Sequence, residues 1–152
     1  MKNEHPTIGH HYIVEASGCD PNIISDVTKV QKILLQAAEI SGVTVFSSSF
    51  NIFPPNGVSG VVVIAESHIS IHTWPEKGYV ALDIYTCGGT GDPEEATIWA
   101  VEQFGATHYH ISELTRGLDE DDKFFYHSII TWEEDIKEDK INKYNTKNKN
   151  KS

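Results

Sequence analysis

A strict alternation of apolar and mixed side chains along residues 79–87 constrains the fold more than any other feature. Val80, Leu82 and Ile84 point to one side of an extended chain. The opposite side carries Tyr79, Ala81, Asp83, Tyr85 and Cys87. A strand of this kind faces a core on one side only, which is typical of antiparallel sheets. The segment therefore predicts a sheet with one apolar face and one face that needs separate cover.

Two helical regions begin at aspartate-proline pairs, residues 20–21 and 92–93. An aspartate followed by proline is typical of an N-cap and the first helical position. Apolar residues recur at helical spacing through residues 27–40, and Gly42 stands where a glycine would end the helix. The second helical region is expected to stop at Gly105.

The remaining strand formers complete an α+β pattern. Strands are predicted at residues 12–16, 43–53, 58–65, 79–87 and 107–111. We expect a two-layer sandwich of a largely antiparallel sheet with helices on one face, in a single domain of residues 1–132. From residue 133 the chain is rich in Lys, Asn, Glu and Asp, which predicts a polar, disordered tail over residues 133–152.

Composition narrows the range of functions. The chain has 152 residues and a formal net charge of -10, which opposes attraction to nucleic acid or anionic membranes. No stretch has the apolar length of a signal peptide or a membrane span. Cys19 and Cys87 lie far apart in unlike contexts, which favours free thiols in a reducing compartment. We therefore expect a soluble, cytoplasmic protein with neither a nucleic-acid nor a membrane partner.

Reactive side chains are densest in residues 57–89, which read GVSGVVVIAESHISIHTWPEKGYVALDIYTCGG. Strand parity divides the segment that begins at Ser67. It places His68, Ser70 and His72 on one face, and Ser67, Ile69 and Ile71 on the other. A bend at Ser67, or a contact across strands, is then needed to bring His72 to Ser67.

The stretch AESHISIHTWPEKGYVALDIYTCGG, with GVSG upstream, resembles the bacterial and archaeal S-adenosylmethionine decarboxylases. The likeness extends over most of residues 9–117 and includes GHHYIVEASGCD, FNIFPPNGVSG and HISELTRG. The ESH, IHTWPE and TCG elements are specific in this order and spacing, whereas GVSG alone is a weak signal. The resemblance implies a self-processing, pyruvoyl-dependent decarboxylase of spermidine and polyamine biosynthesis.

In the family pattern the chain cuts itself between Glu66 and Ser67. Ser67 Oγ attacks the Glu66 carbonyl, and breakdown of the resulting ester leaves a pyruvoyl group in place of Ser67. That group forms a Schiff base with the substrate amine and acts as an electron sink, so that no pyridoxal phosphate is needed. The substrate that the resemblance implies is S-adenosylmethionine.

The resemblance also assigns roles to five further side chains. His72 and Ser59 assist processing by proton transfer, and His72 also lies against the substrate. Cys87 protonates the substrate α-carbon after decarboxylation, a step that suits a thiol because it is mostly protonated near neutrality yet able to give up its proton. Phe53 faces the sulfonium, and Glu76 holds the ribose hydroxyls.

Several alternatives stay open at this stage. Taken alone, the assigned side chains have ordinary explanations: a surface hydroxyl for Ser67, a buried filler for Cys87, a core position for Phe53 and a solvated turn for Glu76. Zinc could be bound by histidines from the set His10, His11, His68, His72 and His108, but no pair has a recognisable zinc spacing and we expect no metal. The same pyruvoyl chemistry could act on ornithine or arginine. A homologue that never cleaves could act as a regulator.

The mixed face that carries Asp83, Tyr85 and Cys87 is too apolar to stand fully in water. We expect it to pack against the same face of a second copy, so that the sheets of two protomers meet face to face. The resemblance implies the same dimer of processed protomers, with sites near the interface. Asp83 and Tyr85 can then line the subunit contact, and neither is placed in the catalytic set.

Overall fold

The structure is a computed structural model that describes residues 7–65, 67–87, 91–135 and 148–151. Within these ranges, one sheet of eight strands has the order β2-β3-β4-β5-β1-β6-β7-β8, and all neighbouring strands are antiparallel. The strands are β1 (Gly9–Ser17), β2 (Val45–Phe53), β3 (Gly57–Ile64), β4 (Ser67–Trp74), β5 (Tyr79–Thr86), β6 (His108–Glu120), β7 (Phe124–Asp135) and β8 (Asn148–Lys151). The helices are α1 (Pro21–Ile24), α2 (Val27–Ile40), the 3-10 turn η1 (Pro75–Lys77) and α3 (Pro93–Gln103).

Aspartate caps begin the helices at the positions that the sequence predicts. The side chains of Asp20 and Asp92 accept hydrogen bonds from backbone N–H groups in the first turns of α1 and α3. A further cap, Asp26, starts α2 after the single turn of α1. Just beyond α2 and α3, Gly42 and Gly105 have φ angles of +69° and +77°, a conformation that glycine adopts without a steric penalty. The predicted bounds of α2 are confirmed.

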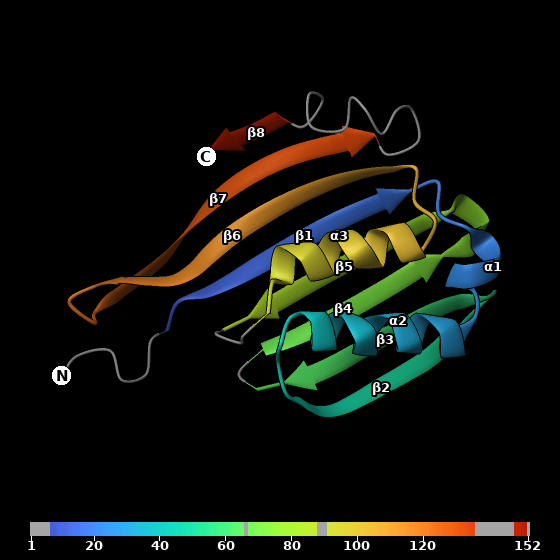
Figure 1. Ribbon diagram of the computed structural model, residues 1–152, viewed down its shortest axis with the longest axis horizontal. Helices are drawn as coiled ribbons and strands as arrows, with labels where there is room; N and C mark the ends of the chain where they lie inside the picture. Colours follow the sequence, from blue (N-terminus) through green and yellow to red (C-terminus); the bar gives the residue numbers. More distant parts are fainter. Residues whose placement is uncertain (1–6, 66, 88–90, 136–147, 152) are drawn as a thin grey trace.

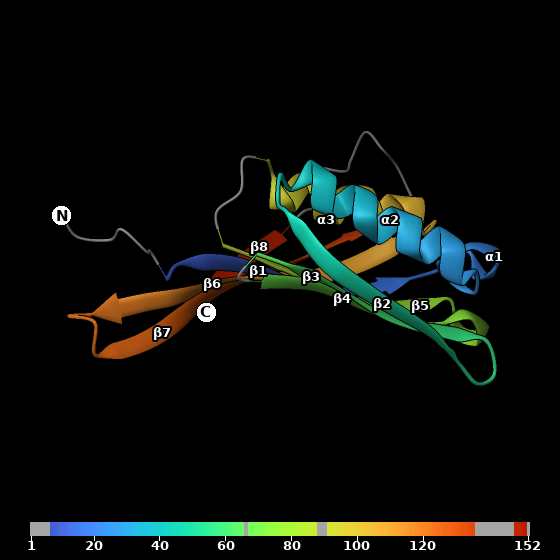
Figure 2. The same ribbon diagram turned by 90° about the horizontal axis from the view of Figure 1, so that it is seen from below.

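The helices form one layer and the sheet forms the other (Figure 1, Figure 2). Helix α2 packs over β2 and β3, and α3 packs over β1 and β5. The core between the layers is built from alternate strand residues and from the inner sides of the helices. Its fully buried members include Val14, Ile69, Ile71, Val80, Ile84, Leu34, Val101 and Phe104. An α+β sandwich with helices on one face, as the sequence predicts, is confirmed.

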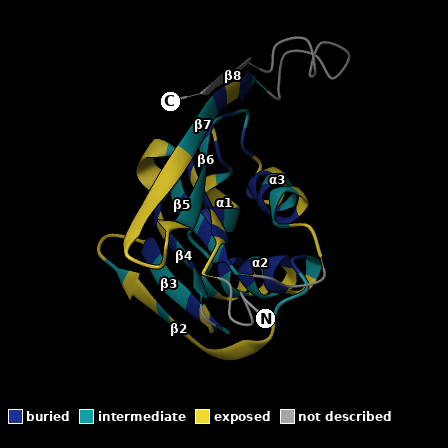
Figure 3. Cartoon of the chain, turned by 90° about the vertical axis from the view of Figure 1, so that its left-hand side faces the viewer, coloured by how far each residue is buried: buried dark blue, intermediate teal, exposed yellow. Residues whose placement is uncertain are grey.

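The other face of the sheet, which we call the open face, carries the opposite set of alternate residues. In β3, β4, β5 and β1 these are Ser59, Val61, Val63, His68, Ser70, His72, Ala81, Asp83, Tyr85, His11, Ile13 and Glu15. None of the helices in the described ranges covers this face (Figure 2). Two of its apolar side chains remain substantially exposed, Val63 at 39% and Ile13 at 37%. Figure 3 shows further exposure along β2 and at the tip of the β6–β7 hairpin.

Two strands at the C-terminal side differ from the sequence prediction. The strand expected at residues 107–111 continues to Glu120 as β6. It is followed by β7, which the sequence analysis did not anticipate. Aromatic and β-branched residues are dense in β7, and the Trp132 side chain is buried in the core. Residues of this kind favour a strand, and their pairing with β6 extends the sheet beyond the strands that the sequence predicts.

The expected disordered tail therefore begins too early. Residues 133–135 belong to β7. Glu134 is buried, and its carboxylate is satisfied there by a hydrogen bond from the Tyr109 hydroxyl. Residues 148–151 pair with β7 as β8, which corrects the tail prediction for that segment as well. Residues 136–147 and 152 lie outside the described part of the chain.

Candidate active site

Ser67 opens β4 at the hairpin that follows β3. It pairs in register with Ile64 of β3, and its Oγ donates a hydrogen bond of 3.0 Å to the Ala65 carbonyl. Glu66, whose carbonyl the resemblance assigns to the cut, lies outside the described residues. The half-buried Ser67 hydroxyl is thus held within the hairpin itself rather than by a catalytic side chain.

Cys87 follows β5 at the same end of the sheet as Ser67. His68 pairs with Tyr85, so that Ser67 and Cys87 each lie at the outer end of their strand. Parity places Cys87 with Tyr85 on the open face, and its thiol is free and partly buried. The two residues therefore lie on neighbouring strands at the same end of the sheet, while parity places the Ser67 side chain on the face of Ile69 and Ile71 and the Cys87 side chain on the open face.

Ser59 and His72 form a direct pair on the open face. They are register partners across β3 and β4, and Ser59 Oγ lies 2.8 Å from His72 Nδ1. The predicted parity of β4 is confirmed, because Ile69 and Ile71 are buried whereas His72 is exposed. No bend interrupts β4 between Ser67 and Trp74, so five residues of extended chain separate Ser67 from His72. At about 3.4 Å per residue this is about 17 Å, and within one chain the pair does not reach Ser67.

The predicted substrate residues lie at the Ser59–His72 end of the sheet. Phe53, the last residue of β2, approaches Trp74 with a ring separation of 6.2 Å, and Trp74 stacks on Tyr79 at 5.0 Å. Burial, together with a hydrogen bond to Glu15, raises the pKa of Tyr79 to about 12. Glu76 is exposed in η1, next to this aromatic row. The structure therefore supplies an aromatic surface and a nearby carboxylate, but far from Ser67.

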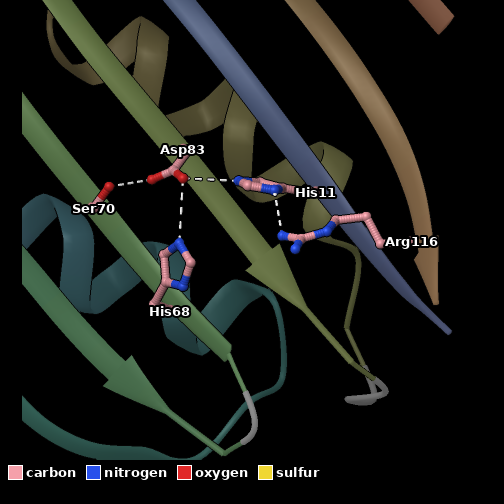
Figure 4. Close-up of polar contacts among 5 residues, drawn as sticks. All are labelled: His11, His68, Ser70, Asp83 and Arg116. Carbon is pink, nitrogen blue, oxygen red and sulfur yellow. Dashed lines mark hydrogen bonds and ion pairs between the residues drawn. The ribbon is translucent and has the colours of Figure 1, made fainter. Parts of the chain in front are cut away.

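Asp83 is the centre of a polar network on the open face (Figure 4). Its carboxylate accepts hydrogen bonds from His11 Nε2 at 2.8 Å and His68 Nε2 at 3.2 Å, and from the Ser70 hydroxyl. Burial by itself would raise the Asp83 pKa, but the hydrogen bonds from His11, Ser70 and His68 outweigh it and lower the pKa to about 2. Asp83 is therefore a permanent anion at neutral pH.

Arg116 extends the network to a fourth strand and fixes the tautomer of His11. Its Nη1 lies 3.1 Å from His11 Nδ1. Because a guanidinium can only donate, Nδ1 must accept, and the ring proton sits on Nε2, where it is donated to Asp83. The chain of donors therefore runs from Arg116 through His11 to Asp83.

Three side chains of this network, His11, His68 and Asp83, have ligand atoms within 4.8 Å of one another and are spaced for a metal ion. A metal would need the Nε2 lone pair of His11, which the donor at Nδ1 leaves protonated. A metal ion bound there would therefore have to displace the Nε2 proton of His11 and its hydrogen bond to Asp83. The zinc alternative in the sequence analysis included His11 and His68 but not Asp83. The sequence does not show this set, because the pairing of β1 with β5 is what brings His11 to Asp83.

Sequence reasoning missed most of this network. It set Asp83 aside as a contact residue and gave Arg116 no role. The one available signal was the parity that places Ser70 and Asp83 on the same side of their strands as His68 and Tyr85. The contribution of Arg116, more than one hundred residues from His11 in sequence, depends on the position of β1 between β5 and β6.

The fold and the site define the class: an α+β protein whose ionisable side chains gather on the uncovered face of an antiparallel sheet. A model of the S-adenosylmethionine decarboxylase family matches residues 10–117. The chain belongs to the S-adenosylmethionine decarboxylase family.

Individual relatives agree with this assignment. The chain is 59% identical over 128 residues to the S-adenosylmethionine decarboxylase proenzyme of Pyrococcus horikoshii, covering 84% of this chain and 92% of the relative. It is 45% identical to the proenzyme of Carboxydothermus hydrogenoformans over 73% of this chain and 87% of that one. The crystal structure of the adenosylmethionine decarboxylase from Aquifex aeolicus superposes with a TM-score of 0.70 at 33% identity, covering 78% of this chain and 98% of that one.

Within the described ranges, no helix is long and apolar enough to cross a bilayer.

Proposed function

We propose that this chain is a self-processing decarboxylase that converts S-adenosylmethionine to its decarboxylated form and carbon dioxide, for spermidine and polyamine synthesis. The observation that carries the proposal is the placement of Ser67 at the β3–β4 hairpin with the free Cys87 thiol at the same end of the sheet. The names of the relatives, which are proenzymes of this activity, support it. Both cysteines are free thiols, which suits the reducing cytoplasm, where we propose that the enzyme works.

The cut that we propose falls between Glu66 and Ser67. Attack of Ser67 Oγ on the Glu66 carbonyl moves the acyl group from nitrogen to oxygen and forms an ester. Elimination then releases the Glu66 carboxylate, and hydrolysis of the remaining imine releases ammonia and leaves a pyruvoyl group at the start of β4. The hairpin fits this change, because Ser67 supplies the hydroxyl and the cut frees the first residue of β4 to turn about its own bonds.

The sheet is arranged so that such a cut does not release either product. Residues 1–66 contribute β1, β2 and β3, whereas residues 67–152 contribute β4 to β8. Strand β1 lies between β5 and β6, and β3 pairs with β4. The two products therefore interlock across three strand boundaries, and their shared core holds them together.

Each protein group has a separate task in the proposed reaction. The pyruvoyl group, once formed, supplies the electrophilic carbonyl that takes up the substrate amine and the electron pair released with carbon dioxide. Cys87 donates a proton to the substrate α-carbon. Phe53 lies against the sulfonium, where an aromatic ring contributes about 0.5–2 kcal/mol, and Glu76 accepts hydrogen bonds from the ribose. His72, paired with Ser59, moves protons during processing and borders the substrate.

The separation of about 17 Å between Ser67 and His72 supports a site shared by two copies. We propose that two open faces pack against each other around a two-fold axis. An antiparallel overlay sets the Ser67–Cys87 end of one copy against the Ser59–His72 end of the other, and it does so twice. Phe53 and Glu76 then reach the substrate from the second copy. The exposed Val63 and Ile13 become buried in the same step.

Substrate identity is tested by carbon dioxide release from S-adenosylmethionine, ornithine and arginine on one preparation. We expect release from S-adenosylmethionine alone. Phe53→Ala should raise KM for this substrate, because it removes a contact to the sulfonium without touching the Ser67 end. Carbon dioxide release from ornithine or arginine instead would leave the proposed pyruvoyl reaction in place and contradict S-adenosylmethionine as the substrate.

Sharing of the site is tested by co-expressing two inactive variants. Ser67→Ala cannot be cut, and His72→Ala should stay uncut because it lacks the proton-transfer group. In mixed dimers the His72→Ala chain still has Ser67 and receives His72 from its Ser67→Ala partner. We expect cleavage of the His72→Ala chain only, which intact masses distinguish. If neither chain is cut in mixed dimers that are shown to form, His72 acts within its own chain and the shared site is wrong.

A further inference from the structure

Gly9 creates the space in which the Cys87 thiol lies. It is on the open face of β1, next to the end of β5. A Cβ built on Gly9 would lie 2.6 Å from Cys87 Sγ and 2.8 Å from Tyr85 Cε1. Both distances are shorter than real Cβ contacts, so both side chains occupy the room that the glycine leaves open. The thiol and the tyrosine ring therefore lie together over the backbone of β1.

Tyr85 supplies the phenol that lies beside that thiol. The two residues are two positions apart on the same side of the chain, and the Tyr85 ring and the Cys87 sulfur share the space above Gly9. Partial burial, followed by the contact with Cys87, raises the pKa of Tyr85 above its ordinary value, while the Arg116 charge acts in the opposite direction. The phenol therefore keeps its proton at neutral pH and is available as a donor to the neighbouring sulfur.

The Tyr85 ring is itself held from several sides. The Arg116 guanidinium carbon lies 4.4 Å from the ring centroid, within the range of a cation-π contact. The imidazoles of His11 and His68 lie at ring separations of 5.1 Å and 5.9 Å. These neighbours leave the ring little freedom to turn away from Cys87.

Asp83 anchors this arrangement at its far end. The carboxylate accepts from His11 Nε2, which leaves His11 Nδ1 as the acceptor for Arg116. A guanidinium with one N–H engaged in this way keeps its planar face over Tyr85. In this chain, seen in Figure 4, Arg116 donates to His11 and His11 donates to Asp83, whose carboxylate is the final acceptor.

We propose that Tyr85, clamped by Arg116 and the His11–Asp83 pair, is a positioning residue that orients and activates the Cys87 thiol. This rests on the proposed function only in taking Cys87 as the proton donor to the substrate. The phenol directs the S–H group during proton delivery and donates to the sulfur once the proton has left. No residue of the clamp needs to touch the substrate.

Alkylation of Cys87 by iodoacetamide at pH 7 reads the contact directly and does not require a working decarboxylase. Cys19 does not interfere, because burial raises its pKa to about 12 and leaves it unreactive. We expect Tyr85→Phe, which keeps the ring and removes the donor, to slow alkylation about threefold or more. Tyr126→Phe, which removes an exposed hydroxyl from β7, is the matched control and should alkylate at the wild-type rate.

Turnover supplies the second readout. Tyr85→Phe should be cleaved normally, lower kcat about 3- to 10-fold and leave KM unchanged, because Cys87 acts after binding. Arg116→Gln should slow alkylation in an otherwise wild-type chain but add little to Tyr85→Phe, since it acts through the phenol.

Each contrary result has a definite meaning. A Tyr85→Phe thiol that alkylates at the wild-type rate overturns the proposal, whatever the turnover. Slower alkylation with unchanged kcat overturns the role of Tyr85 in the reaction. If the wild-type chain is neither cut nor able to release carbon dioxide, the proposed function fails, and the alkylation comparison still decides whether Tyr85 holds the thiol.

Discussion

The two faces of the sheet divide stability and chemistry between them. On the helix-covered face, Ile69, Ile71 and Ile84 are fully buried, and their neighbours are other apolar side chains. On the open face, the residues that alternate with them are His68, Ser70, His72, Asp83 and Tyr85. One strand therefore serves both purposes, and adjacent residues of β4 should respond to substitution in opposite ways. Within one chain, the end of the sheet that carries Ser67 and Cys87 does not meet the end that carries Ser59 and His72.

Ser67→Ala has the largest expected effect on the proposed chemistry. The variant lacks the nucleophile, so we expect one intact chain and no conversion at any incubation time. Denaturing electrophoresis and intact mass measure this. Since the substitution removes one hydroxyl bonded within the hairpin, the fold should persist, as circular dichroism would show. Normal cleavage of this variant would remove Ser67 from the site.

Cys87→Ala separates cleavage from turnover. We expect complete cleavage, because the thiol has no part in the acyl shift, and a fall in kcat of about 100-fold or more, the usual contribution of a positioned proton donor. Carbon dioxide release on fully processed protein is the measurement. A processed variant with wild-type turnover would contradict the role of the thiol.

Ile71→Ala and His72→Ala compare the two faces at neighbouring positions. Ile71→Ala should lower the free energy of unfolding by about 2–4 kcal/mol, because it leaves a cavity beneath the helices. His72→Ala should change it by less than about 1 kcal/mol while abolishing cleavage. Urea unfolding in the uncut Ser67→Ala background gives both values on a single chain at one fixed concentration. Equal destabilisation by the two substitutions would break the division between the faces.

Asp83 predicts a pH dependence of stability that originates on the open face. Its folded pKa of about 2 lies below its ordinary value of 3.8, so the carboxylate stabilises the fold above about pH 4, and this contribution is lost as the pH falls toward 2. Its size is about 2 kcal/mol at pH 7. Asp83→Asn should therefore be less stable by about this amount at pH 7 and nearly equal to the parent at pH 2. Urea unfolding at pH 7, 5 and 3 measures the trend, and a difference that does not shrink at low pH would contradict it.

Local sequence patterns predicted much of the fold correctly. The caps at Asp20 and Asp92 and the alternation along β5 each depend on a few adjacent residues, and each is confirmed. The extent of β6 and the existence of β7 were missed. These strands depend on mutual pairing and on the burial of Trp132, which composition does not reveal.

The site was foreseen in its residues more than in its geometry. Ser59 and His72, to which the resemblance assigns the processing role, lie next to each other, yet His72 is distant from Ser67. Strand parity had placed His72 and Ser67 on opposite faces but gave no distance. The contacts of Asp83 with His11, and of His11 with Arg116, link strands that are far apart in sequence. Only the insertion of β1 between β5 and β6 creates these contacts, and one sequence gives no sign of it.

The most direct test of the whole account is the intact mass of the purified wild-type chain under denaturing conditions. We expect two polypeptides, residues 1–66 and residues 67–152, with the second lighter by one ammonia than simple hydrolysis would leave it. That mass identifies both the cut and the pyruvoyl group that Ser67 becomes. A single uncut chain, or a second polypeptide that still begins with an ordinary serine, would contradict the assignment of Ser67 as the source of the catalytic group.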